Sequence, residues 1–313
     1  MLTFGPVPSR RLGKSLGINN IIPKHCSYSC IYCQVGRTLK YAVKRQVFYS
    51  PDEIYKDVLK SVKESEKKDQ KIDYLTFVAD GEPTLDINLK NTLNMINSLG
   101  IKTAIISNSS LIWMKDVQED LTDFDWVSLK CDSVEETIWK KIDRPHGSLN
   151  LENILNGIIS FSQNFKNELN IEIMLIEGIN DSSNHLIKLR SFLEKVNYHK
   201  IYLSIPTRPP AEKTALKPDE SIINMAYNIL SEKLHDIQLN IGFEGNEFSS
   251  TGILEDDILK ITAVHPMRID SVIALIDKEK GSLNIIKKLK EENKIKEVDY
   301  NGERFIVRVL NKI

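Results

Sequence analysis

Three of the four cysteines in this chain of 313 residues lie in one short stretch, HCSYSCIYC at 25–33. Cys26, Cys30 and Cys33 have the spacing C-x3-C-x2-C. A structural zinc ion takes four ligands, and this motif supplies only three, because His25 is expected to point away from the pocket that the loop forms. Three thiolates suit three irons of a [4Fe–4S] cube and leave the fourth iron open to a ligand that is not protein. An open metal position is a feature of catalytic sites, so the motif predicts an iron–sulfur centre with a chemical role.

The charge around the cysteines is uneven, although the whole chain has a net charge of only −1. Residues 1–50 contain eight Lys or Arg and no Asp or Glu. This positive segment would offset a negative thiolate-bound cluster and favours an anionic ligand or substrate. The alternative interpretation is a solvated basic face that acidic helices balance elsewhere.

The composition indicates a globular protein, with 41% apolar and 27% charged residues. Clustered cysteines make a poor disulfide framework, whereas inside a cell they usually serve metal or redox chemistry. The stretch MLTFGPVPSRRLGKSLG has no apolar leader core, and no segment has the unbroken apolar length that spans a bilayer. We therefore expect a mature, cytoplasmic chain with no membrane partner.

After the cysteines, short apolar runs alternate with longer amphipathic stretches, which predicts a parallel sheet with crossover helices. The expected strands are 16–23, 72–85, 102–108, 125–132, 171–178 and 200–210. The expected helices are 50–68, 88–99, 111–120, 134–164, 182–196 and 218–233. The first helix has Ser50 as N-cap, Pro51 at its first position and Glu53 at the capping-box position. Because ligands gather at the carboxyl ends of such strands, the loops that follow the strands should converge with the cysteines on one rim.

The alternation of strand and helix patterns ends near residue 250. Beyond it, the sequence predicts three short helices followed by a hairpin. Asn301-Gly302 between KEVDY and ERFIVRV is a strong signal for a two-residue turn. This layout predicts a winged-helix-like domain over 251–313 after a first domain over 1–250. Residues 253–313 carry twelve basic and eleven acidic residues. The balance favours a structural or protein-docking unit over a nucleic-acid binder.

Further motifs follow in order along the chain: FGPVPSRRLGKSLGIN, CSYSCIYCQVG, DGEPTL, KIDRPHGSL, LIEGIND and PTRPPAE. With the cysteine motif and Tyr32 before its last member, they resemble the radical S-adenosylmethionine (SAM) superfamily. Within it, residues 4–212 resemble the Fe–S oxidoreductases grouped with wyosine-type tRNA-modifying enzymes. The resemblance implies a partial (β/α)6 TIM-like barrel and one [4Fe–4S] cluster on the three cysteines. It also implies reductive cleavage of SAM to a 5′-deoxyadenosyl radical, which takes hydrogen from a substrate.

The resemblance also implies contacts to SAM at the ends of the strands. Gly81, Glu82 and Pro83 match the motif that receives the SAM amino group, with Asp80 in place of its first glycine. Polar side chains that end the next two strands could reach the ribose or the SAM carboxylate, and these are Ser107, Asn108, Lys130 and Asp132. Tyr32 is expected near the adenine. The alternatives are an ordinary turn for DGEP and local caps or ion pairs for the polar side chains.

Three arginines are candidates for the substrate side of the site. Arg10, Arg11 and Arg208 lie in segments expected near the open mouth, where a guanidinium group can grip a carboxylate or a phosphate. Structural ion pairs to barrel carboxylates are the alternative. His146 could shuttle a proton or be an exposed loop histidine without a chemical role. Cys131 is interpreted as a small buried apolar residue in preference to a ligand.

Three hypotheses follow from these features. The first is a radical SAM enzyme with an unidentified substrate, which could be tRNA, a peptide or a small molecule, and a donor such as flavodoxin or ferredoxin. The second is a tRNA-modifying version of this enzyme, although residues 1–25 lack the additional cysteines of wyosine-forming relatives. The third is a cluster-bearing regulator without catalysis that uses the winged helix on DNA.

Overall fold

The computed structural model describes residues 2–242, 248 and 253–309, and an eight-stranded sheet forms its centre. The strand order is β1-β2-β5-β6-β7-β8-β9-β10. Their bounds are β1 Thr3–Ser9, β2 Gly13–Ile18, β5 Tyr74–Phe77, β6 Lys102–Ser107, β7 Trp126–Lys130, β8 Glu168–Met174, β9 Lys200–Ser204 and β10 Ile237–Asn240. The pair β1 and β2 is antiparallel, and every other neighbouring pair is parallel. The expected α/β fold with a parallel sheet, consistent with a partial TIM barrel, is confirmed.

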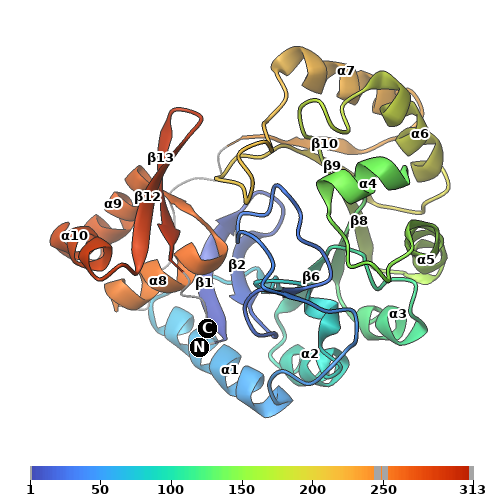
Figure 1. The fold of residues 1–313 in the computed structure, drawn as a ribbon. Helices are drawn as coiled ribbons and strands as arrows, with labels where there is room; N and C mark the ends of the chain where they lie inside the picture. The colour runs from blue at the N-terminus through green and yellow to red at the C-terminus, as the bar shows by residue number, and fades with distance from the viewer. Residues whose placement is uncertain (1, 243–247, 249–252, 310–313) are drawn as a thin grey trace.

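Helices connect the parallel strands and surround the sheet (Figure 1). They are α1 Pro51–Lys67, α2 Leu89–Asn97, α3 Lys115–Leu121, α4 Glu136–Ile142, α5 Leu151–Asn164, α6 Ser183–Leu193 and α7 Glu220–Ser231. The predicted start of α1 is confirmed, since the Ser50 hydroxyl accepts from the Glu53 amide and the Glu53 carboxylate accepts from the Ser50 amide. The main core fills the space between the helices and the sheet.

Several predicted elements need correction. The strands expected at 72–85 and 200–210 end at Phe77 and Ser204, and the rest of each range is the polar loop with which it was expected to end. The strand expected at 16–23 ends at Ile18, where the side chains of Asn19 and Asn20 begin to bond across to the loop after β5. The helix expected at 111–120 begins only at Lys115. The helix expected at 134–164 is two helices, α4 and α5. Between them Arg144 has a φ of +45° and precedes Pro145, which disfavours helical geometry in the preceding residue.

Two strands of the central sheet were not expected from the sequence. Strand β1 contains Pro6 and Pro8, which weaken a strand pattern, and it lies at the edge of the sheet where proline is tolerated. Strand β10 is only IQLN, with two exposed residues, and closes the other edge. Both edge strands bring polar side chains to the pocket at the end of the sheet. The loop after β1 carries Arg10 and Arg11, and β10 ends in Asn240.

The C-terminal elements form a second, smaller unit with the order α8 Leu254–Val264, β11 Met267–Arg268, α9 Ile269–Lys278, α10 Asn284–Glu291, β12 Ile295–Tyr300 and β13 Glu303–Arg308. Its sheet has the order β11-β13-β12. The predicted hairpin is confirmed, since Tyr300 pairs with Glu303 around Asn301 and Gly302, both with positive φ.

The core of this unit includes Phe4 and Val7 of β1, so the first strand packs against the C-terminal unit. The boundary expected between residues 250 and 251 lies outside the described residues. Across the part of the chain that is described, no helix is long and apolar enough to cross a membrane.

Candidate functional site

One pocket of about 260 Å³ lies at the carboxyl ends of the parallel strands. The three clustered cysteines all line it. So do nine of the other residues selected from the sequence, namely Arg10, Arg11, Tyr32, Gly81, Glu82, Ser107, Asn108, Lys130 and Arg208. Pro83 and Asp132 do not line it. The convergence expected from strand order therefore occurs, and it joins segments almost two hundred residues apart.

The loop that carries the cysteines is held from outside by the segment that separates α4 from α5. The Ser29 amide donates to the Asp143 carbonyl at 3.0 Å, and the Ile31 amide donates to the Ile142 carbonyl at 2.9 Å. The His146 amide donates to the Ser27 carbonyl at 2.8 Å. Because a continuous helix would have used these carbonyls internally, the helix break is what supports the cysteine loop.

The three thiols suit a cluster better than a single metal ion. Among the described residues, no three His, Cys, Asp or Glu side chains are arranged to hold a single metal ion. Cysteine thiolates are the ligands that iron–sulfur clusters take. The backbone amides of Ser27 and Tyr28 beside Cys26, and of Val35 and Gly36 beside Cys33, lower the pKa of these two thiols against the larger effect of burial. Such amides stabilise a cluster-bound thiolate.

Burial raises the pKa of all three thiols, that of Cys26 to about 12. The thiols are therefore neutral near pH 7 and poor nucleophiles until a metal displaces their protons. All four cysteines are free of disulfides. The chemistry and placement of these donors fit a [4Fe–4S] cluster.

The loop after β5 packs directly against the start of the cysteine loop. The Lys24 amide donates to the Asp80 carbonyl at 2.8 Å, and the Glu82 amide donates to the His25 carbonyl at 3.2 Å. A Cβ atom on Gly81 would lie 1.8 Å from the His25 carbonyl oxygen. Only glycine permits this approach, which places the two predicted motifs side by side.

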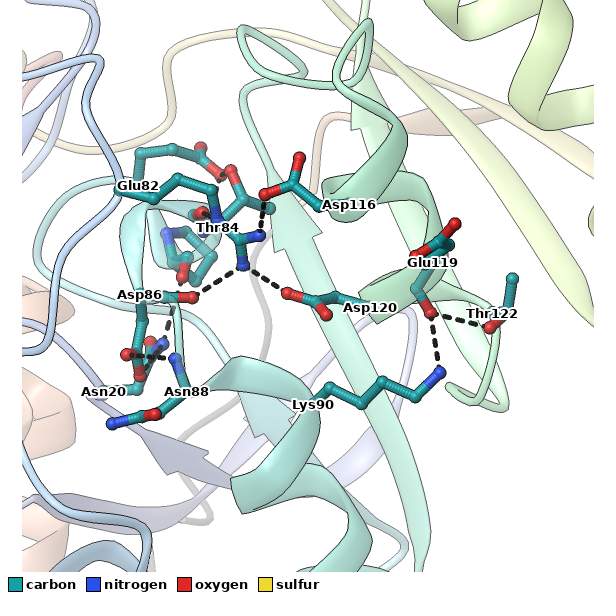
Figure 2. Close-up of polar contacts among 12 residues, drawn as sticks. Asn20, Glu82, Thr84, Asp86, Asn88, Lys90, Asp116, Glu119, Asp120 and Thr122 are labelled. Carbon is teal, nitrogen blue, oxygen red and sulfur yellow. Dashed lines mark hydrogen bonds and ion pairs between the residues drawn. The ribbon is translucent and has the colours of Figure 1, made fainter.

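The Glu82 carboxylate is 1% exposed and organises the pocket wall. Its Oε1 accepts from the Ser107 hydroxyl at 2.8 Å and the Thr84 hydroxyl at 2.6 Å, and its Oε2 accepts from the Asn108 amide at 2.8 Å. Figure 2 shows Glu82 beside Thr84 on this loop. The carboxylate is therefore anchored mainly through Oε1, which leaves acceptor capacity on Oε2 toward the pocket that Glu82 lines.

The far side of the same loop is fastened to α3 by Arg45. Its guanidinium group donates to the Thr84 carbonyl at 3.0 Å and the Asp86 carbonyl at 2.8 Å. It also pairs with Asp116 and Asp120, which face Asp86 in Figure 2. This buried cation fixes the turn that follows Glu82, so the carboxylate is held in place before any ligand binds.

Tyr32 lies between the cysteines and the floor of the pocket. Its hydroxyl hydrogen-bonds to the Asp132 carboxylate, whose other oxygen accepts from the Met174 amide at 2.6 Å. Asp132 is thus occupied below the pocket, where it holds Tyr32 and not a ligand. The Lys130 ammonium lies 4.9 Å from the centre of the Tyr32 ring and does line the pocket.

The opposite wall carries a buried ion network. The Glu172 carboxylate pairs with Arg11 and lies 3.6 Å from the Lys130 ammonium. These two cations lower the pKa of Glu172 to about 2 despite its burial. Arg11 therefore forms a structural ion pair, which was the alternative to a contact with substrate. Two cations and one carboxylate leave this network with a net positive charge.

The other two arginines hold loops at the mouth. Arg10 donates to the Asn240 carbonyl at 2.9 Å and thereby ties the β1–β2 loop to the end of β10. Arg208 donates to Gln34 of the cysteine loop at 2.6 Å and contacts His265 of the C-terminal unit. Arg208 thus joins the pocket to this unit, as does Tyr300, whose hydroxyl donates to the carbonyl of the pocket residue Pro206 at 3.2 Å.

The remaining candidates lie outside the pocket lining. His25 packs edge to face on Phe48 at 5.5 Å, as expected of a residue that points away. The His146 ring contacts the Ser148 hydroxyl at 2.9 Å on the exposed loop. Cys131 is 4% exposed in the main core, where burial raises the pKa of its thiol.

Four residues of the site were not selected from the sequence. Glu172 interrupts the apolar run of β8. A charged residue within such a run is a sequence signal from which a site residue could have been predicted. Lys24 and Asp80 stand next to recognised motifs and line the pocket. Asp143, whose carboxyl oxygen lies 3.3 Å from the Cys30 sulfur, could be found only after the helix break was known.

The mostly parallel sheet, consistent with a partial TIM barrel, carries three half-buried cysteines at the carboxyl ends of its strands. Residues 20–189 match the model of the Radical SAM superfamily. The chain belongs to this superfamily, as the sequence motifs predicted, and it is an enzyme. Members of the superfamily use a [4Fe–4S] cluster and SAM.

The chain is also similar to a relative of known sequence, and it shares its fold with solved structures. The chain is 48% identical to UPF0026 protein MJ1312 of Methanocaldococcus jannaschii over 98% of this chain and 96% of that protein. A radical SAM methyltransferase from Sphaerobacter thermophilus shares the fold with a TM-score of 0.57 and 13% identity, over 76% of this chain and 68% of its own. SuiB of Streptococcus suis bound to SAM shares it with a TM-score of 0.51 and 14% identity, over 72% of this chain and 52% of its own.

Proposed function

We propose that Cys26, Cys30 and Cys33 bind one [4Fe–4S] cluster and that the enzyme cleaves SAM reductively to act on a substrate not yet identified. The observation that carries the proposal is that the three thiols line the same pocket as Glu82, Asn108 and Lys130. When bound, the cluster supplies the electron that splits SAM into methionine and a 5′-deoxyadenosyl radical, which takes a hydrogen atom from the substrate.

The residues of the chain bind and orient the reactants. Gly81 and Glu82 lie against the cysteine loop, where backbone and carboxylate oxygens suit the amino group of SAM. Asn108 donates through its side chain to the Cys26 sulfur at 3.4 Å, so with Ser107 it connects the cluster loop to the end of β6. The Tyr32 ring offers a flat surface beside the cysteines for the adenine.

The substrate we propose is anionic. Arg11 and Lys130 outnumber Glu172 in the ion network that lines the pocket, and Arg10 and Arg208 line the same pocket. Lys130 stays protonated, because the neighbouring carboxylates raise its pKa against the effect of burial. A carboxylate or phosphate of the substrate would be attracted to this network.

We propose that the C-terminal unit is a winged-helix domain with a docking or structural role. Its order of helices and strands, with β11 beside β13, supports this proposal. The lysines of α10 are all paired, Lys287 with Glu291, Lys288 with Glu255 and Lys290 with Glu297. This pairing gives no support to a regulator that reads DNA with α10, and it favours a protein partner such as a flavodoxin or ferredoxin electron donor.

The proposed function is tested by anaerobic reconstitution with iron and sulfide, reduction with dithionite and addition of SAM. The wild type should load about four irons per chain and release 5′-deoxyadenosine. Cys30→Ala should do neither, whereas Cys131→Ala, which removes a thiol outside the pocket, should do both. A fully loaded wild type that neither cleaves SAM nor changes its EPR signal when SAM is added would contradict the proposal.

A further inference from the structure

A second pocket, of about 280 Å³, lies between the barrel and the C-terminal unit. Residues 205–208, which follow β9, line both this pocket and the barrel pocket, so the two pockets are neighbours. The C-terminal unit supplies the rest of the wall from the start of α9 and from the hairpin of β12 and β13. None of the described residues that line it belongs to the cysteine motif or to the loop after β5, so cofactor binding does not account for it.

Two contacts fasten the walls of this pocket to each other. The Tyr300 hydroxyl of the hairpin donates to the Pro206 carbonyl at 3.2 Å. The Arg208 Nη2 lies 2.5 Å from the His265 Nε2, which accepts because a guanidinium group only donates. The pocket is therefore formed across the boundary between the two units before any ligand binds. Clefts between domains are preferred positions for small-molecule sites.

The charges around this pocket favour an anion. The described residues that line it include three permanent cations, Arg208, Lys217 and Arg268. Glu303 is the single carboxylate among these described residues, and it pairs with Arg268 at 2.7 Å. One carboxylate against three cations leaves the described wall with a net positive charge, which attracts a phosphate or a carboxylate.

Lys217 is the lining cation best placed to meet a ligand. It lies in the loop between β9 and α7, where the Glu177 amide donates to the Leu216 carbonyl at 3.0 Å and Pro218 follows, so the backbone around it is held. Within the part of the chain that the structure describes, its ammonium group forms no ion pair or hydrogen bond. All three of its donors can therefore bind an anionic group.

We propose that the second pocket is a subsite for a phosphate or carboxylate group of a small-molecule substrate, whose reacting part lies in the barrel pocket. The inference rests on the proposed function, because it concerns the same substrate. Residues 205–208 line both pockets, so one molecule bound beside this segment can contact the two. The C-terminal unit then forms part of the substrate site, and it selects substrates by an anionic group remote from the reacting carbon.

The subsite is tested by isothermal titration of the cluster-loaded, full-length protein with inorganic phosphate and with malonate. The tighter of these two probes shows whether the pocket prefers a phosphate or a carboxylate. Lys217→Met should weaken the binding of this probe by about 3- to 10-fold, because it removes a partly screened charge. Glu303→Gln should strengthen it by about 2- to 5-fold, because it raises the net charge of the wall by one.

Two control variants separate the subsite from general effects of charge or folding. Lys213→Met and Asp299→Asn remove exposed charges from the same loop and the same hairpin, at positions outside the pocket wall, and should leave the affinity unchanged. A wild type that binds neither probe, or equal weakening in Lys217→Met and Lys213→Met, would overturn the subsite.

The outcome for the subsite is distinguishable from the outcome for the proposed function, because probe binding requires no SAM cleavage. A wild type that releases 5′-deoxyadenosine but binds neither probe would overturn the subsite and leave the proposed function standing. The expected probe pattern in a wild type that releases no 5′-deoxyadenosine would uphold the anion site and overturn the proposed function.

Discussion

The barrel pocket and helix α10 use the same charged residue types in opposite ways. In the pocket, the side chains of Arg11, Lys130 and Glu172 are 16%, 18% and 7% exposed, so water screens their charges little. On α10, the side chains of Lys287 and Lys288 are 77% and 56% exposed and pair with acids one turn away or on α8. Burial, not the number of lysines, decides which charges are available to bind a ligand strongly.

The largest effect is expected from Glu172→Gln, which leaves Arg11 and Lys130 buried without their shared counter-charge. The free energy of unfolding should fall by about 3 to 5 kcal/mol, measured by urea unfolding. Because the pKa of Glu172 is lowered to about 2, its stabilising contribution is present above the ordinary pKa of glutamate and is lost as pH falls toward 2. If the exposed Glu136→Gln variant lost as much stability, the distinction between buried and exposed charges would be wrong.

A smaller loss is expected from Gly81→Ala, because the new Cβ would collide with the His25 carbonyl and separate the two loops of the pocket. Unfolding free energy should fall by about 3 kcal/mol, and iron content after reconstitution should fall with it. Gly147→Ala is the matched control, since nothing lies within 4 Å of its Cβ position. If both variants load iron equally, contact between the loops does not organise the cluster site.

Asp80→Asn should stabilise the protein in the absence of SAM, in contrast to Glu172→Gln. Burial raises the pKa of Asp80 to about 7, so the folded state is penalised as pH rises from the ordinary aspartate pKa toward 7. At pH 8 the variant should gain about 2 kcal/mol, and the gain should vanish as pH falls to about 4. Thermal unfolding across this pH range measures the stability difference. A variant less stable than wild type at pH 8 would show that the buried Asp80 carboxylate does not destabilise the folded state.

The smallest effects are expected on α10. Lys288→Gln and Lys290→Gln remove exposed, paired charges, so neither the melting temperature nor SAM cleavage should change measurably. Neither wild type nor variant should bind duplex DNA in a salt-dependent manner. Binding by wild type that the two substitutions abolish would reverse our assignment of this face.

Local features of the chain were predictable because they depend on neighbouring residues. The capping box at Ser50 and Glu53 and the turn at Asn301-Gly302 are short-range signals, and both are present in the structure. The spacing of the cysteines and the order of the motifs were sufficient to predict the superfamily, which the comparison confirmed. Strand order alone was sufficient to predict that the motifs meet at one rim, because parallel strands end on the same side.

Tertiary structure decided which side chains pair with one another at the carboxyl ends of the strands. Arg11 meets Glu172 across 161 positions of sequence, and no local pattern encodes such a pairing. The break after Ile142 supports the cysteine loop through long-range backbone bonds, and β1 shares its core with the C-terminal unit. The cofactor class was predictable from the sequence, because three thiols on one loop are a local arrangement, and the superfamily match confirmed it. Only the fold decided which charges are buried, and therefore which can bind, because burial depends on residues brought together from the whole chain.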